Sequence, residues 1–352
     1  MLSMLINSLY NIIDSMFVAR IGEDALTAVS LVYPLQTLVV SISVGFGVGI
    51  NAAVAFFLGA GEKENADRSA AQGLLLSLLH GALLSVGGFL CIPHFLPLFT
   101  SDARILDWGM EYAYIVLSFS MVITVQIAFE KIYQAVGNML VPMVCMAAGC
   151  ITNIILDPVF IFGLGPIPRL EVKGAAIATV IGQVVTLILY LIWYFCKDMG
   201  LSLGRRNMKL TGEICGKLYT VGVPCSLTMG LPSLLITVLN GFAAAFSPVY
   251  ILILGVYFKL QSFIYLPANG IVQGMRPILS YNYGAGEKKR MRRIIQICSV
   301  MILVIMAAGM LLFLLAPGII MKLFTEDVVT VREGSAALRI ISLGFVVSGV
   351  SV

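Results

Sequence analysis

The chain has 352 residues, of which 59% are hydrophobic and 11% charged, and its mean hydropathy is +1.00. Soluble domains are about 45–50% apolar and about 25% charged, so this composition excludes an ordinary water-soluble fold. The net charge of +4 comes from basic residues in short loops and does not indicate nucleic-acid binding. The composition instead predicts an integral membrane protein.

A helix that crosses a membrane needs about 20 mostly apolar residues. Apolar runs of this length are too long for transmembrane β-strands, which are shorter and alternate in polarity. We therefore expect an all-α, polytopic helical bundle. Ten such stretches follow one another along the chain: 3–20, 31–58, 73–98, 111–136, 139–163, 174–196, 215–243, 248–282, 294–321 and 335–352.

The loops between these stretches differ in charge. Most of the loop lysines and arginines fall in alternate loops, and they are densest at 197–217 and 288–293. The positive-inside rule places this set of loops in the cytoplasm, and with it the N-terminus. The chain opens on an apolar stretch without a basic region or cleavage site before it, so no signal peptide is visible.

An internal repeat relates the two halves of the chain. Residues 58–63 read LGAGEK, and residues 283–288 read YGAGEK, which is an offset of 225. The same register aligns Leu35-Gln36 with Leu260-Gln261, and residues 98–100 with 323–325. Positive charge follows the turn in both copies, so both have the same orientation in the membrane. This pattern predicts a parallel repeat, related by an axis along the membrane normal.

The repeat predicts two lobes. Residues 1–200 form an N-terminal lobe with spans one to six, the first of them shortened, and residues 201–352 form a C-terminal lobe with spans seven to ten. Residue 352 corresponds to residue 127 of the first copy, so the second copy has no counterparts of the last two spans of the first. We expect a chain that is shortened at both ends relative to a protein with twelve spans.

Several segments, in this order, resemble those of the multidrug and toxic compound extrusion (MATE) family of transporters, over essentially the whole chain. They are Asn11–Asp14, the GAGEK turn, Gly137-Asn138, Asn153–Pro158, Gly174–Thr179, Leu266-Pro267, Gln273-Gly274 and Tyr281–Ala285.

This resemblance implies a two-lobe exporter of twelve helices in the inner membrane of a bacterium or archaeon. Such a protein exchanges organic, often cationic, compounds for protons or sodium by alternating access. We therefore expect a small-molecule organic substrate, a lipid bilayer as the surroundings, a monomer, and no cofactor other than the coupling ion. We expect neither nucleic-acid binding nor an enzymatic activity.

Few ionisable residues fall inside the predicted spans. Each costs about 2.5–3.5 kcal/mol at the centre of a membrane on insertion scales, so each is a candidate for function. Asp14 has apolar neighbours, and Asn153 and Asp157 share one helix face because they are four residues apart. Pro158 disfavours helical geometry at Asp157 and can release backbone carbonyls there. The full set is Asp14, Glu130, Lys131, Asp157, Lys259, Arg276 and Arg339.

The resemblance assigns the cation-coupling site to Asp14, Asn153, Asp157 and Thr179, which would bind a proton or sodium. The alternative is a polar network that only holds three helices together. Two carboxylates are more than such a network requires, which favours the coupling site. The spans at 218–243 and 335–352 contain no carboxylate, so we expect the site in the first lobe alone.

Weaker candidates for the lining of a substrate cavity are Gln36, Glu130, Tyr133, Gln261 and Arg276. Glu130 and Lys131 are adjacent, and adjacent residues on a helix do not face each other, so an ion pair between them is not implied. A structural role and contact with a cationic compound both remain open for Glu130.

Three other functions are alternatives to ion-coupled export. A flippase of lipid-linked oligosaccharide, from the same broad superfamily, would need a basic cavity, for which Lys131, Lys259 and Arg276 leave room. A membrane-embedded enzyme is disfavoured because no HExxH or GxSxG motif occurs. A fragment without transport activity is the third. The seven cysteines are scattered and His80 and His94 lack ligand spacing, so we expect free thiols and no metal site.

Overall fold

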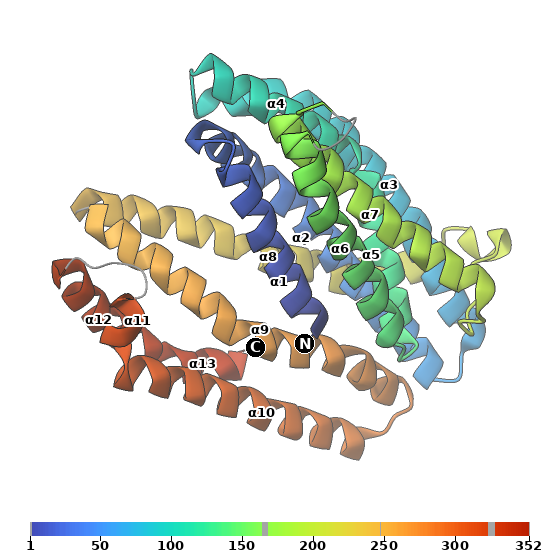
Figure 1. The fold of residues 1–352 in the computed structure, drawn as a ribbon. Helices are drawn as coiled ribbons and strands as arrows, with labels where there is room; N and C mark the ends of the chain where they lie inside the picture. The colour runs from blue at the N-terminus through green and yellow to red at the C-terminus, as the bar shows by residue number, and fades with distance from the viewer. Residues whose placement is uncertain (1, 164–167, 247, 323–327, 352) are drawn as a thin grey trace. The chain divides into compact units, whose positions relative to one another are not determined.

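A computed structural model describes residues 2–163, 168–246, 248–322 and 328–351. Within these ranges the secondary structure is α-helical, apart from two short 3₁₀ turns (Figure 1). This confirms the predicted all-α membrane fold. The helices divide into two compact units, Leu2–Gly230 and Leu231–Val352, and the division falls inside one long helix, α8. The lobes at 1–200 and 201–352, which the repeat predicts, stay a prediction.

The larger unit holds the first seven helices and the start of the eighth. Polar caps and glycines set several of their ends: the Asp102 carboxylate accepts hydrogen bonds from the backbone N–H groups of Arg104 and Ile105 at 2.9 and 3.2 Å, and Gly163 ends a helix in the left-handed region. The elements are α1 (Leu2–Ala19), α2 (Glu23–Gly59), α3 (Lys63–Phe95), η1 (Leu96–Leu98), α4 (Ala103–Ser118), α5 (Ser120–Ala135), α6 (Leu140–Phe162), α7 (Glu171–Cys196), η2 (Arg205–Met208) and α8 (Gly212–Phe246).

The smaller unit continues from α8 and holds five further helices. Its buried core gathers around Met306, Phe313 and Phe345. The helices are α9 (Pro248–Gly284), α10 (Lys288–Leu315), α11 (Pro317–Lys322), α12 (Val328–Ser342) and α13 (Gly344–Ser351).

The repeat extends to the backbone. Helices α2 and α9 begin and end 225 residues apart, and α3 and α10 begin at the same offset. The turns between them match as well: Gly61 and Gly286 have φ angles of 77° and 72°. The N–H of Glu62 donates to Phe57 and the N–H of Glu287 to Asn282, each at 2.9 Å. Glycine adopts such a φ angle without strain, which explains the glycine at this position in both copies.

Each predicted span lies on one helix or on two consecutive helices. Among the described residues, five helices (α2, α3, α6, α7 and α10) are long and apolar enough to cross a membrane by themselves. Helices α4 and α5 meet at a bend of 45° and pass the same test as a pair. The predicted span at 111–136 therefore corresponds to a bent pair of helices.

Glycines allow close packing between helices inside the larger unit. A Cβ atom added at Gly49 would collide with the carbonyl oxygen of Leu218, and one added at Gly45 with the backbone of Ser226. Helix α2 therefore packs directly on the backbone of the first part of α8. Helices α6 and α7 approach through a second pair, Gly149 and Gly182, where a Cβ on either would lie within 2.8 Å of the other's carbonyl oxygen. This second contact positions the polar cluster described next.

Candidate functional site

The close packing of α6 on α7 brings three predicted site residues together. The side-chain amide of Asn153 donates to the Asp157 carboxylate at 3.2 Å and to the Thr179 hydroxyl at 3.5 Å. Asn153, Asp157 and Thr179 are 2%, 0% and 5% exposed. Residues from two helices thus form one buried polar cluster, at the level where Gly182 lets α7 approach Asn153.

Asp14 joins this cluster from α1. Its carboxyl group, which is partly buried, lies within hydrogen-bonding reach of the Asp157 carboxyl group. Two carboxylates at such a distance repel each other when both are ionised, so the pair favours a shared proton or another bound cation. The structure therefore brings together all four residues of the predicted cation-coupling site: Asp14, Asn153, Asp157 and Thr179.

Three oxygen atoms in the cluster are buried and have no hydrogen-bond partner among the described residues. They are Asp14 Oδ1, Asn153 Oδ1 and Asp157 Oδ2. A buried acceptor without a partner costs about 1–3 kcal/mol, so several such atoms in one cluster call for a ligand that supplies positive charge. Carboxylate and carbonyl oxygens suit hard cations and can equally hold a proton.

Helix α6 runs through Asp157 and Pro158 to Phe162, within the span predicted at 139–163. Proline has no N–H to bond the carbonyl of the residue four positions earlier, Ile154, so it can leave that carbonyl without its helical partner while the helix goes on. The packing against α7 holds α6 in helical geometry despite the local preference of the Asp-Pro pair.

Two tyrosines extend the cluster, and the sequence analysis did not single them out. Tyr10 on α1 and Tyr112 on α4 both lie close to Thr179. Gln36, a predicted cavity residue, donates to the Tyr112 hydroxyl at 3.4 Å. The sequence held one signal, because Tyr10 precedes Asp14 by four residues and so shares its helix face.

Glu130 lies in a buried network of its own. The Lys131 ammonium is 2.8 Å from the Glu130 carboxylate and 3.2 Å from the side-chain oxygen of Gln134, and the Gln134 amide also donates to Glu130 at 2.8 Å. Asn51 of α2 donates to the backbone carbonyl of Lys131 at 3.0 Å. Although the spacing did not imply it, adjacent residues do pair here, because the long lysine side chain curls back to its neighbour.

The other candidates for the substrate cavity lie in both units. Tyr133 is 3% exposed and stacks on Tyr190 inside the larger unit. Gln261 and Arg276 lie on α9 of the smaller unit, both partly buried, and their role in a substrate cavity stays a prediction. The side chain of Lys259 lies outside the described residues.

A bundle of membrane-spanning helices with two carboxyl groups buried together inside one unit is typical of an ion-coupled membrane transporter. The MatE family model matches residues 1–159 and 224–352. The chain therefore belongs to the MatE family of multi-pass membrane transporters.

Individual relatives agree with this assignment. The multidrug export protein MepA of Staphylococcus haemolyticus (strain JCSC1435) is 25% identical over 351 residues, which is 99% of this chain and 76% of the relative. A solved structure described as the outward-facing conformation of a multidrug resistance MATE family transporter has a TM-score of 0.87 at 25% identity and covers 99% of this chain and 77% of its own. A MATE structure in a bent conformation has a TM-score of 0.91, with the same identity and coverage.

Proposed function

We propose that this protein exports organic compounds from the cell and couples their export to the inward movement of a proton or sodium. The export of varied organic compounds is supported by its membership of the MatE family and by the multidrug exporter MepA among its relatives. The coupling is supported above all by the three buried, unpartnered oxygens of Asp14, Asn153 and Asp157, which belong to one polar cluster of α1 and α6.

The mechanism that we propose depends on the pair Asp14 and Asp157. Asp14 belongs to α1, whereas Asp157 belongs to α6, whose packing on α7 is close. A bound cation offsets the repulsion between the two carboxylates and stabilises α1 against α6. Once the cation leaves, the repulsion favours a different position of α1. A ligand shifts a conformational equilibrium only by its difference in affinity for the two states, and this electrostatic difference supplies one.

The coupling site belongs to one lobe in this proposal. At the repeat offset of 225, Asp14 corresponds to Leu239 and Tyr10 to Leu235, so the second copy offers neither group. Export therefore uses one ion site in the first lobe. The substrate cavity opens alternately to the two sides of the membrane. We further propose a monomer in the cell membrane, with its N-terminus in the cytoplasm on the side of the basic loops.

The flippase alternative, which requires a basic cavity, receives no support from Lys131, one of the three basic residues that left room for it. That ammonium group is buried and paired with Glu130 and Gln134. Its charge is therefore balanced inside the larger unit.

Transport by the purified protein in proteoliposomes tests the proposal. A fluorescent organic cation is loaded into the vesicles, and a pH gradient and a sodium gradient are imposed in separate experiments. We expect one of the two gradients to drive dye movement, and a protonophore or a sodium ionophore to abolish it. Dye movement that ignores both gradients would contradict coupled export, and protein-free vesicles provide the baseline.

A further inference from the structure

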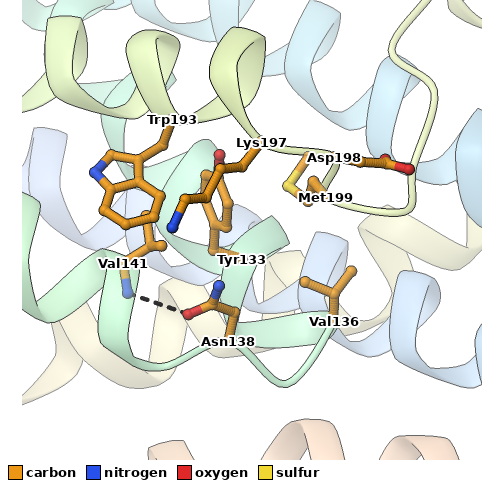
Figure 2. Close-up of a pocket in the computed structure, with 8 residues that line it drawn as sticks. All are labelled: Tyr133, Val136, Asn138, Val141, Trp193, Lys197, Asp198 and Met199. Atoms are coloured by element: carbon orange, nitrogen blue, oxygen red, sulfur yellow. Dashed lines mark hydrogen bonds between the residues drawn. The ribbon is translucent and has the colours of Figure 1, made fainter.

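A cavity lies in the larger unit, where α5 ends, α6 begins and α7 ends. Its volume is about 200 Å³, and its walls include Tyr133, Asn138, Trp193, Lys197 and Asp198 (Figure 2). Cavities that hold drug-sized molecules are about 300–1,000 Å³, so this one suits a smaller polar group. None of its lining residues belongs to the cation cluster around Asp14.

Two neutral hydrogen-bonding side chains, Tyr133 and Asn138, line this cavity. The Tyr133 hydroxyl is buried and has no hydrogen-bond partner among the described residues. The side-chain oxygen of Asn138 accepts from the N–H of Val141 at 3.2 Å, which leaves its amide N–H groups to donate (Figure 2). The Tyr133 hydroxyl and the Asn138 amide N–H groups can both donate hydrogen bonds. The cavity is therefore suited to a ligand that carries acceptor oxygens.

The charge of the cavity comes from Lys197. Its ammonium group lies 4.4 Å from the centre of the Trp193 ring, and no carboxylate forms a salt bridge with it in the described part of the chain. Asp198 carries the one carboxylate of the lining, but it accepts a hydrogen bond from the N–H of Gly200 at 2.7 Å and points toward that loop (Figure 2). A cation without a carboxylate partner, beside two hydrogen-bond donors, favours a phosphate group.

The surroundings of the cavity are apolar and exposed. Leu140 and Val144 on α6 are 61% and 42% exposed, and Ile192 and Phe195 on α7 are 50% and 79% exposed. In a bilayer these side chains face lipid. Tryptophan and lysine beside such a surface are typical of the level of the lipid headgroups, where the indole ring and a long cationic side chain both reach the interface.

We propose that this cavity binds the headgroup of an anionic phospholipid. The phosphate lies between Lys197, the Asn138 amide and the Tyr133 hydroxyl, and the acyl chains lie along the exposed apolar side chains of α6 and α7. The cavity stands at the end of the bundle that carries the basic loop 197–217, so the lipid belongs to the leaflet on that side. The site is separate from the cation cluster and is independent of the proposed transport.

Trp193 can report on this site, because the chain has only one other tryptophan, Trp108. The full chain with Trp108→Phe is purified in a neutral detergent and titrated with phosphatidylglycerol while the fluorescence of Trp193 is followed. We expect a saturable change, because a phosphate that binds Lys197 alters the cation over the indole ring. Phosphatidylcholine and inorganic phosphate are titrated in parallel, and we expect neither to match phosphatidylglycerol.

Variants in the same background locate the site. We expect Lys197→Gln to raise the half-saturating concentration of phosphatidylglycerol by roughly tenfold or more, because it removes a charge-assisted hydrogen bond. Tyr133→Phe is expected to weaken binding by roughly threefold to tenfold. Lys197→Arg keeps the charge and is expected to retain binding, and the matched control Lys63→Gln, at the exposed start of α3, is expected to leave it unchanged.

Three results would overturn the proposal. The first is an affinity for phosphatidylglycerol that is the same with Lys197 and with Lys197→Gln, or that falls equally in the control Lys63→Gln. The second is phosphatidylcholine acting as well as phosphatidylglycerol, which would remove the preference for an anionic headgroup. The third is inorganic phosphate producing the same change at the same concentration, which would identify a site for a soluble anion.

Discussion

The carboxyl groups of Asp14 and Asp157 lie within hydrogen-bonding reach of each other, although they belong to the first and sixth helices of the chain. Asn153 holds one oxygen of Asp157 at 3.2 Å, and the second Asp157 oxygen has no hydrogen-bond partner among the described residues. This pair is the centre of the proposed coupling site. Asp14 is therefore the first residue to replace in a transport assay.

Replacement of Asp14 by Asn keeps the shape of the side chain and removes its charge. We expect ion-driven efflux of an organic cation from proteoliposomes to fall by about tenfold or more, because the repulsion that couples ion release to the movement of α1 is lost. Asp24→Asn is the matched control. Asp24 is exposed near the start of α2, 3.8 Å from Arg104. Efflux by Asp14→Asn with an unchanged dependence on the ion gradient would remove Asp14 from the coupling site.

Thr179 contributes a hydroxyl that accepts a hydrogen bond from Asn153 at 3.5 Å and that lies near Tyr10 and Tyr112. We expect Thr179→Val to raise the ion concentration required for half-maximal efflux by roughly fivefold to tenfold, because one neutral hydrogen-bonding group is lost. Thr152→Val is the control, since the Thr152 hydroxyl bonds only its own helix, at Ala148. An equal effect of both substitutions would indicate a general change in helix packing instead.

Glu130 and Lys131 form a buried pair, with side chains 11% and 4% exposed. We expect Lys131→Met to lower the free energy of unfolding by about 3–5 kcal/mol, because it leaves Glu130 buried without its partner, and Glu130→Gln with Lys131→Met to recover most of the loss. Thermal unfolding in detergent measures both.

A matched exposed pair provides the control for this cycle. Arg68 and Glu64 are 2.6 Å apart with side chains 41% and 69% exposed, and their removal is expected to cost less than about 1 kcal/mol. If the double variant of Glu130 and Lys131 is as unstable as Lys131→Met alone, the unpaired Glu130 carboxylate is not the cause of the lost stability.

Gly49 lies where α2 meets the backbone of α8 at Leu218. We expect Gly49→Ala to destabilise the protein by about 1–3 kcal/mol, because the added Cβ forces the two helices apart. Gly87→Ala is the control, since an added Cβ there meets nothing within 4 Å. A melting temperature of Gly49→Ala equal to that of Gly87→Ala would show that this helix contact can shift without cost.

The membrane fold and the repeat are both predictable from the amino-acid sequence. Hydropathy is a local property, and in lipid each helix satisfies its own backbone hydrogen bonds, so apolar length predicts helices directly. The repeat register was equally visible, because the turns at Gly61 and Gly286 need glycine for their positive φ angles. The four residues of the proposed coupling site were also predicted before the structure, through the family resemblance and the high cost of carboxylates in a membrane.

Which of these groups meet depends on the packing of the helices. The contact between Asp14 and Asp157, the approach of Tyr10 and Tyr112 to Thr179, and the pairing of Glu130 with Lys131 all depend on how side chains pack. Helix faces far apart in the sequence are brought together by interlocking contacts such as Gly149 against Gly182. Hydropathy and spacing describe one helix at a time, so they cannot predict which side chains of different helices meet.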